Sequence, residues 1–169
     1  MPEISPLGWF HTGIAIIALV CGVYSLVKFK LIARAQPTGL VYLVCTFVAA
    51  VTALGIYQHG GFGPAHGLAV LTLVGLAVGA IGEQTRLFGG LSPYAHVSGY
   101  SFTFLCHMIP AITDGLMRLP VGDPVVTNPE DPLLRGFYLL FLVLFVVGLG
   151  AQVVMLRNRG RGVAEGSPA

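Results

Sequence analysis

One long apolar stretch, residues 94–120, carries a row of polar and ionisable side chains. Its members follow one another at intervals of three, four or seven residues: His96, Tyr100, Thr103, His107 and Asp114. In an α-helix these intervals place the side chains near one face. The stretch is long enough to cross a bilayer, where an ionisable side chain at mid-helix costs about 2.5–3.5 kcal/mol on insertion scales. We therefore expect this face to be turned toward other helices, water or a cofactor.

His107 is the most informative of these residues because it falls near the middle of the predicted span. Water is absent at that depth, so the imidazole requires either a functional role or a hydrogen-bond partner on another helix. Pro110 follows three residues later and removes the N–H that would bond to the carbonyl of Cys106. The proline predicts a kink beside His107, which either lines a cavity or serves ordinary helix packing.

Three histidines fall where predicted spans meet the outer surface. His11 opens the first span, His59 ends the second and His66 opens the third. Asp114 lies near the outer end of the fourth span. Histidine is a common ligand of Zn and Cu, so His11, His59, His66 and Asp114 are predicted to form a metal site. The alternative is that the histidines are interfacial polar side chains and that Asp114 pairs with Arg118, four residues later.

The histidines also suggest a haem site. Haem b is held by axial histidines, and the two ligands must come from different helices at matching depth. The candidate ligands are His11, His66, His96 and His107, paired as His11 with His66 or as His107 with a histidine of the outer group. Such a site would serve redox chemistry or electron transfer, with a quinone as the expected partner.

No catalytic residue is predicted. The sequence contains no nucleophile elbow, phosphate-binding loop, HExxH or paired-cysteine zinc motif, and whether the chain is an enzyme is left open. Glu83, at the inner end of the third span, is predicted to pair with Arg86 or to continue a proton path toward His96.

The composition is that of an integral membrane protein. The 169 residues are 55% hydrophobic and 9% charged, with a mean hydropathy of +0.83, whereas soluble domains carry about 25% charged residues. The length allows a single transmembrane domain over residues 1–169 and no separate soluble domain. The net charge of +2 does not indicate binding to nucleic acid.

Apolar segments near the roughly 20 residues that a bilayer requires predict an all-α bundle of five transmembrane helices. The predicted spans cover residues 9–27, 38–57, 65–81, 94–119 and 136–156, and a flexible tail follows at 157–169. The third span contains Gly75 and Gly79, a GxxxG pair that would let another helix approach closely.

Basic residues predict the orientation of these spans. Seven of them fall on one side: Lys28, Lys30, Arg34, Arg86, Arg157, Arg159 and Arg161. The other side has two, Arg118 and Arg135. The bias predicts a multi-pass inner-membrane protein with its N-terminus outside and its C-terminus in the cytoplasm.

Four segments carry a resemblance to a known family. They are FHTGIAIIALVCGVYSLVK, GLVYLVCTFVAAVTALGIY, AHGLAVLTLVGLAVG and AHVSGYSFTFL, and over roughly residues 10–110 they resemble an uncharacterised bacterial multi-pass membrane-protein family, a domain of unknown function. The helix-opening histidines of that family match His11, His66 and His96. Members carry a further histidine before the glycine of the second span, where this chain has no histidine. The resemblance implies a fold and a topology, and no established activity.

The sequence therefore supports three kinds of function. The first is a haem- or metal-binding membrane protein, with a histidine site in the outer half of the bundle. The alternatives are a non-catalytic accessory subunit of a larger membrane complex, whose partners are other membrane subunits, and a small transporter.

Overall fold

The computed structural model describes residues 5–57 and 61–165, with side chains as far as residue 159. Every regular element in this part of the chain is a helix. In order they are α1 (Pro6–Phe29), α2 (Pro37–Ala53), α3 (Pro64–Gln84), a short 3-10 turn η1 (Gly89–Leu91), α4 (Ser92–Arg118) and α5 (Pro132–Glu165). The prediction of an all-α chain is thus confirmed.

Proline marks the beginning of each long helix. It occupies one of the first two positions of α1, α2, α3 and α4, and α5 begins at Pro132. The first helical N–H has no partner within the helix, so proline loses nothing there and its fixed φ favours the helix. At α1 the Ser5 hydroxyl also accepts a hydrogen bond from the Gly8 N–H at 3.1 Å, which is the usual N-terminal cap.

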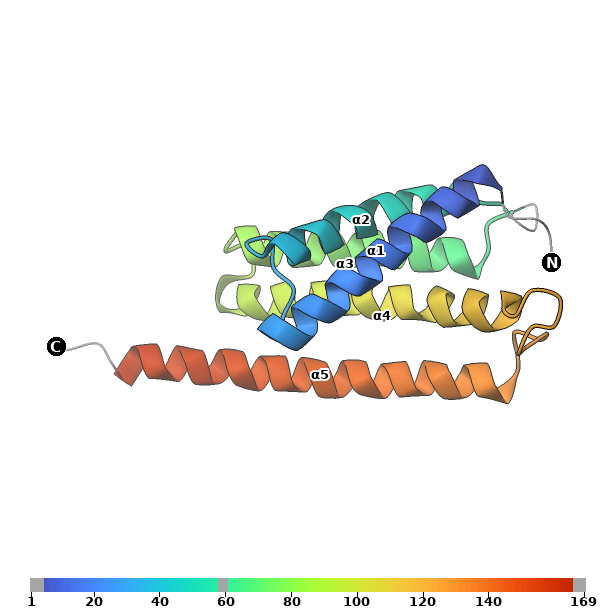
Figure 1. Ribbon diagram of the computed structural model, residues 1–169. Coiled ribbons are helices and arrows are strands. Elements are labelled where there is room, and N and C mark those ends of the chain that lie inside the picture. The colour runs from blue at the N-terminus through green and yellow to red at the C-terminus, as the bar shows by residue number, and fades with distance from the viewer. Residues whose placement is uncertain (1–4, 58–60, 166–169) are drawn as a thin grey trace.

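The long helices run alternately in opposite directions, so the bundle has two ends (Figure 1). One end holds the start of α1 and the α2–α3 and α4–α5 connections, and the other holds the α1–α2 and α3–α4 connections. We call these the outer and the inner end, after the predicted orientation. Three helices are long and apolar enough to cross a membrane: α1, α3 and α5 over Pro132–Arg159.

Three boundaries differ from the sequence predictions by four residues or more, and one of them is the start of the fifth helix at Pro132 rather than at residue 136. The second helix ends at Ala53 rather than at residue 57, because Gly55 and Ile56 donate to Thr52 and Ala53 in a tight turn. The fifth helix continues to Glu165, so most of the predicted tail at 157–169 is helical. Arginine is a good helix former, and no proline interrupts the sequence before Pro168.

Glycines bring α3 and α4 into close contact. A Cβ on Gly75 would lie 2.9 Å from the Thr103 side chain, and one on Gly99 would lie 2.5 Å from the backbone nitrogen of Gly79. A Cβ on Gly79 would meet the ring of Tyr100. The predicted GxxxG pair is therefore confirmed as a packing surface, and α4 is the helix that packs on it.

The fifth helix lies against α4 at the edge of the bundle (Figure 1). Two hydrogen bonds fasten it to α4. Near the outer end the Thr113 and Tyr138 hydroxyls are 2.7 Å apart, and near the inner end the Ser101 hydroxyl donates to the Gln152 side-chain oxygen at 2.9 Å. Between these points most of α5 is exposed and apolar, which suits contact with lipid.

Candidate functional site

His107 lies inside the bundle, as its depth in the sequence predicted. Only 7% of the residue is exposed, and its ring centroid is 6.4 Å from that of Tyr42 on α2. Its Nδ1 is buried and makes no well-formed hydrogen bond among the described residues, and the backbone of Thr103, one turn earlier, is a polar neighbour of the ring. Helix α4 continues through Pro110 to Arg118, so the proline does not interrupt it. A buried imidazole nitrogen without a well-formed bond is costly. His66 Nε2 is in the same condition, so it is the position of His107 inside α4, rather than at a helix start, that makes it the stronger functional candidate.

His11 is held in a single orientation by α2. Its Nδ1 is 3.0 Å from the Ala49 carbonyl oxygen and 3.1 Å from the Thr52 hydroxyl oxygen. A carbonyl only accepts, so Nδ1 carries the proton and donates to it. The other nitrogen, Nε2, is thereby left as a lone pair that can accept a proton or bind a metal ion.

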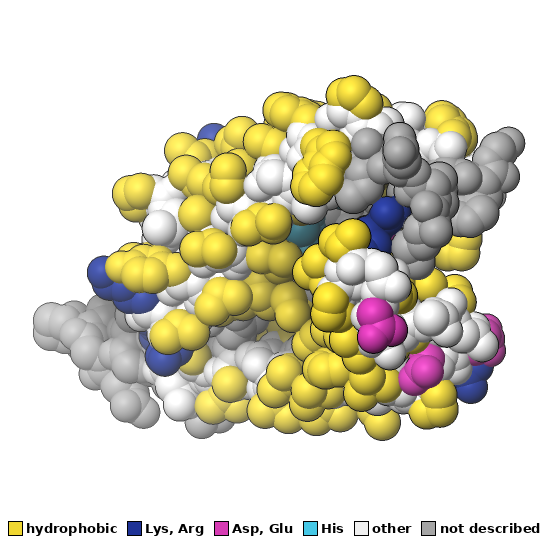
Figure 2. Space-filling model, turned by 45° about the vertical axis from the view of Figure 1, so that its right-hand side comes forward, with side chains coloured by type: hydrophobic (Ala, Val, Ile, Leu, Met, Phe, Trp, Pro, Cys, Tyr) yellow, Lys and Arg dark blue, Asp and Glu magenta, His cyan; other side chains and the backbone are white. Residues whose placement is uncertain are grey.

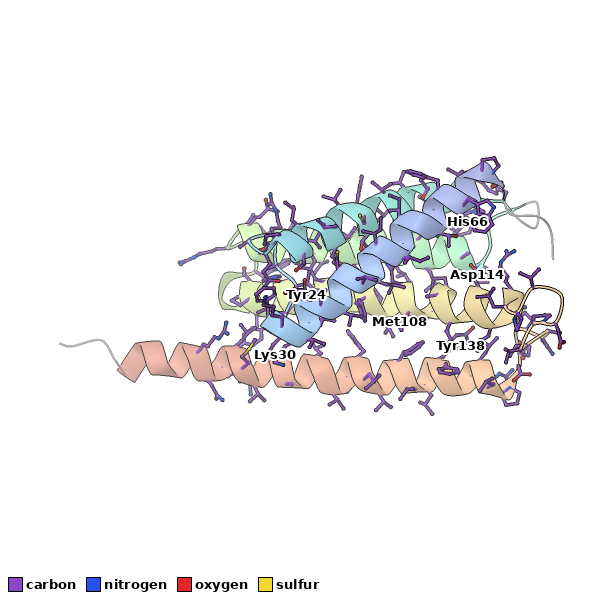
Figure 3. All side chains as sticks on the ribbon, in the orientation of Figure 1. Tyr24, Lys30, His66, Met108, Asp114 and Tyr138 are labelled. Carbon is purple, nitrogen blue, oxygen red and sulfur yellow. The ribbon has the colours of Figure 1, made fainter. Side chains whose placement is uncertain are left out.

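His11, His107 and Asp114 are ionisable side chains of the outer half. His11 lies within electrostatic range of both His107 and Asp114. Asp114 lies toward the outer end of α4 (Figure 3) and pairs with Arg118, with 3.4 Å between the carboxylate oxygen and Nε. The predicted i,i+4 ion pair is confirmed. Figure 2 turns the outer end toward the viewer and shows a histidine in a hollow among hydrophobic side chains, with a Lys or Arg beside it.

Buried hydroxyl groups continue from His107 toward the inner end. The Tyr42 and Thr103 hydroxyl oxygens are 2.7 Å apart, and the Thr103 hydroxyl donates to the Tyr100 carbonyl at 2.7 Å. The Tyr100 hydroxyl donates to the Glu83 carboxylate at 2.9 Å. We call the whole row the polar column, and it comprises Asp114, His11, His107, Tyr42, Thr103, Tyr100 and Glu83.

Glu83 is the inner terminus of this column. It accepts hydrogen bonds from the Tyr100 hydroxyl and from the backbone N–H of Arg34 at 2.7 Å. No ion pair joins it to Arg86, so that prediction is wrong. The backbone N–H of the α1–α2 connection is closer than any guanidinium and satisfies the carboxylate instead.

His96 has a structural task at the inner end. Its Nε2 donates to the Ile32 carbonyl at 2.8 Å, and its ring meets that of Tyr100 edge-on at 5.1 Å. Gln152 on α5 donates to the Lys30 carbonyl at 2.9 Å. Together with Glu83, these side chains fasten the backbone of the α1–α2 connection to the other helices.

His66 is occupied at the outer end of α3. Its Nδ1 accepts a hydrogen bond from the Gly63 N–H at 3.1 Å, and its ring lies close to those of Tyr57 and Phe62, with centroids 4.9 and 5.1 Å away. Accepting at Nδ1 places the proton on Nε2. A metal or haem iron bound through Nε2 would require the opposite tautomer, which the Gly63 N–H opposes.

The predicted ligands are therefore brought together only in part. His11 on α1 and His107 on α4 lie within electrostatic range of one another, whereas His66 and His96 bond to other groups. His59, the remaining predicted metal ligand, lies outside the described residues. Among the residues that are described, no group of three His, Cys, Asp or Glu side chains is suitably placed to hold a metal ion.

The bundle is densely packed between Gly22, Tyr42 and Phe104, and a haem near His107 stays a prediction. A Cβ on Gly22 would lie 2.9 Å from both Tyr42 and Phe104, so these rings already fill the space between α1, α2 and α4. The donor set near His107 consists of one further imidazole and hydroxyl groups. Such groups are better suited to exchanging protons than to binding a large ring system.

Sequence reasoning missed two members of these networks. Tyr42 is fully buried on α2 next to Thr46, and the spacing of four between these two polar side chains was the available signal. Gln152 is the one amide side chain in the apolar stretch 136–156, and an isolated polar group in such a stretch predicts an interhelical hydrogen bond.

Comparison with protein-family models, curated proteins and solved structures gave no match. The family resemblance of the four apolar segments thus stays a prediction, and function is inferred from the chain's own residues.

Proposed function

We propose that this chain is a small transporter-like protein of the bacterial inner membrane, which crosses the bilayer five times and conducts protons along the polar column. The observation that carries the proposal is the buried His107, whose Nδ1 makes no well-formed hydrogen bond among the described residues and which lies within electrostatic range of His11 on α1. Ionisable groups inside a membrane bundle commonly mark ion or proton paths.

The arrangement of the helices supports five crossings. If α1, α3 and α5 each cross, then α2 and α4 must return the chain to the side from which the next crossing begins. The 27 residues of α4 span about 40 Å at 1.5 Å per residue, which exceeds the hydrocarbon thickness of about 30 Å. The 17 residues of α2 are shorter, and short flanking turns complete the distance.

The charge distribution supports an outside N-terminus. Side chains are described for six of the seven basic residues counted on the inner side: Lys28, Lys30, Arg34, Arg86, Arg157 and Arg159. All of them belong to the inner-end connections or to the adjacent helix ends. Cytoplasmic loops carry such an excess in inner-membrane proteins.

In the proposed path a proton enters at Asp114, which is exposed at the outer end. It passes to His11 and then to His107, since an imidazole accepts a proton at one nitrogen and releases one from the other. Asp114 and His107 are about 10 Å apart along α4 at 1.5 Å per residue, and His11 on α1 lies within electrostatic range of both. The Tyr42 and Thr103 hydroxyls are hydrogen-bonded to each other, but Thr103 donates to the backbone carbonyl of Tyr100 and not to its hydroxyl. The path therefore requires water between the side chains that no hydrogen bond joins.

A flux assay tests the proposal. Protein in liposomes is given a potassium diffusion potential, and internal pH is followed with a trapped dye. Wild type should acidify or alkalinise the lumen according to the sign of the potential. His107→Gln keeps a polar side chain of similar length but cannot carry the proton, so flux should fall to that of protein-free liposomes.

His66→Gln is the matched control, because His66 is equally buried and lies outside the column. Its flux should equal that of wild type. Flux by His107→Gln at the wild-type rate, or none by wild type, would contradict the proposal.

A redox role is the second candidate, and one observation favours it. The His11 Nδ1–H donates to the Ala49 carbonyl, and metal-ligating histidines are oriented by such a bond on the other ring nitrogen. A transition-metal ion held by His11 and His107 would serve electron transfer, with a quinone as the partner. Elemental analysis of purified wild type and His11→Ala tests it. Metal content that is equal in the two would contradict this candidate.

A role as a non-catalytic subunit of a larger membrane complex remains a third proposal. Apolar side chains cover much of α1 and α5, and these faces suit either lipid or another membrane subunit. Purification in mild detergent, followed by measurement of the particle mass, distinguishes the two. A particle mass equal to that of one chain in its detergent micelle would contradict the proposal of a larger complex.

A further inference from the structure

A narrow groove follows the seam between α4 and α5 and is bounded by α1 at its inner end. Its volume is about 210 Å³. The wall is apolar along most of its length and includes Leu26, Phe104, Met108, Phe141 and Phe145. Figure 3 shows Met108 in the gap between α4 and α5.

The size and chemistry of the groove favour a slender apolar chain. Pockets for drug-sized ligands measure roughly 300–1,000 Å³, so this one is too small for a large ring system. Its two polar side chains, Ser101 and Gln152, already bond to one another and to the Lys30 carbonyl. From Phe141 to Gln152 the groove extends about 16 Å at 1.5 Å per residue. That is about half of a 30 Å hydrocarbon core, or one leaflet.

Positive charge lies at the inner end of the groove. The α5 lining residues Phe141, Phe145, Gly148 and Gln152 are three or four positions apart, and a further seven positions lead to Arg159 on the same face. Lys30, labelled in Figure 3, lies next to α5, where its carbonyl accepts from Gln152. Its ammonium group donates one N–H to the Val27 carbonyl at 2.9 Å, which leaves two N–H groups for an anion.

No carboxylate neutralises this charge in the described part of the chain. Both ion pairs found there, Arg118–Asp114 and Arg135–Glu130, are at the outer end. Glu83 is the acidic side chain described at the inner end, and it is already bonded to Arg34 and Tyr100. The groove therefore opens toward a site that attracts an anion.

We propose that this groove binds one acyl chain of an anionic glycerophospholipid, with Lys30 and Arg159 holding the lipid phosphate. Basic clusters beside transmembrane helices recognise anionic head groups in this way. The lipid would fill the space between the two hydrogen bonds that fasten α5 and would hold that helix to the bundle. The inference rests on the membrane placement proposed above, but not on proton conduction.

Native mass spectrometry of the full chain in mild detergent tests the site, with dioleoyl-phosphatidylglycerol and dioleoyl-phosphatidylcholine as probes. The two lipids share their acyl chains and differ in charge. Wild type should retain one phosphatidylglycerol in preference to phosphatidylcholine. Lys30→Gln and Arg159→Gln should each lower that preference about fivefold, the effect of about one kcal/mol per basic residue.

A glycine pair tests the groove itself. A Cβ on Gly148 or on Gly150 would meet nothing within 4 Å, but only Gly148 lines the groove. Gly148→Leu should fill the groove and abolish retention of phosphatidylglycerol, whereas Gly150→Leu should retain it as wild type does.

Equal retention of the two lipids by wild type would overturn the proposal, as would equal retention of phosphatidylglycerol by the two leucine variants. A dimer without bound lipid would show that a second copy covers the groove and would overturn it as well. Lipid retention is measured without any proton flux. Absence of lipid retention would therefore not contradict proton conduction, and absence of proton flux would not contradict the lipid site.

Discussion

Tyr42 and Thr103 join α2 to α4 through hydroxyl oxygens 2.7 Å apart, and neither side chain is exposed. The Thr103 hydroxyl also donates to the Tyr100 carbonyl, so it accepts from Tyr42. The bond is directional as a result. Thr103 keeps a partner when Tyr42 loses its hydroxyl, whereas Tyr42 is left with the Thr46 hydroxyl, which makes no well-formed bond, when Thr103 loses its own.

This asymmetry predicts unequal effects for two conservative changes. Thr103→Val leaves the Tyr42 hydroxyl buried without a well-formed bond, so the free energy of unfolding should fall by about 1–3 kcal/mol. Tyr42→Phe should cost less, about 0.6 kcal/mol, which is the mean for interhelical hydrogen bonds in membranes. Unfolding in mixed micelles, followed by circular dichroism, measures both.

The double variant completes the cycle. It removes both hydroxyls, so it should be less destabilised than the sum of the single changes. Additive effects would mean that the two hydroxyls do not interact.

The contact between α3 and α4 predicts that two glycines of the same helix will differ sharply. Gly79→Ala puts a methyl group against the Tyr100 ring, and overpacking of this kind costs about 1–3 kcal/mol. Gly67→Ala meets nothing within 4 Å and should leave stability unchanged or raise it slightly through helix propensity. Thermal unfolding in detergent compares the two, and equal melting temperatures would contradict the packing.

The sequence predicted the helices well because long apolar segments and helix-starting prolines are local signals. The spacing of Gly75 and Gly79 indicated a packing surface, and the structure identifies α4 as its partner. What could not be predicted was which polar groups meet. His96 and Glu83 bond to backbone atoms of the α1–α2 connection, and such partners have no side-chain signature.

The candidate site shows the same contrast between local patterns and helix packing. The burial of His107 could be predicted from its depth in an apolar span. Its proximity to His11 could not, because that proximity depends on how α1 crosses the bundle. His66 opens α3 in the sequence as His11 opens α1, yet one accepts a backbone N–H and the other donates to a carbonyl. Equal positions in a pattern thus lead to opposite tautomers.

The inner-end network predicts protection of the α1–α2 connection from trypsin, which cleaves after Lys30 and Arg34. His96→Ala removes the bond to the Ile32 carbonyl. If the loss of this bond lowers the free energy of local unfolding by about 1.4 kcal/mol, cleavage should accelerate about tenfold. Gln84→Ala removes an exposed bond within α3 and should cleave at the wild-type rate, which makes it the control. Unchanged cleavage of His96→Ala would show that the bond does not protect this segment.

The five crossings predict which introduced cysteines an impermeant maleimide reaches in intact cells. Gly61 and Thr127 lie in outer-end connections, and Ala35 and Gly90 in inner-end connections; all four residues are exposed. Gly61→Cys and Thr127→Cys should label from outside, because α2 and α4 return the chain there. Ala35→Cys and Gly90→Cys should label only after permeabilisation. Wild type provides the background, since its three cysteines are buried or half-buried. Equal labelling of Ala35→Cys and Gly61→Cys in intact cells would show that α2 does not cross the membrane. Equal labelling of Gly90→Cys and Thr127→Cys would show that α4 does not cross it.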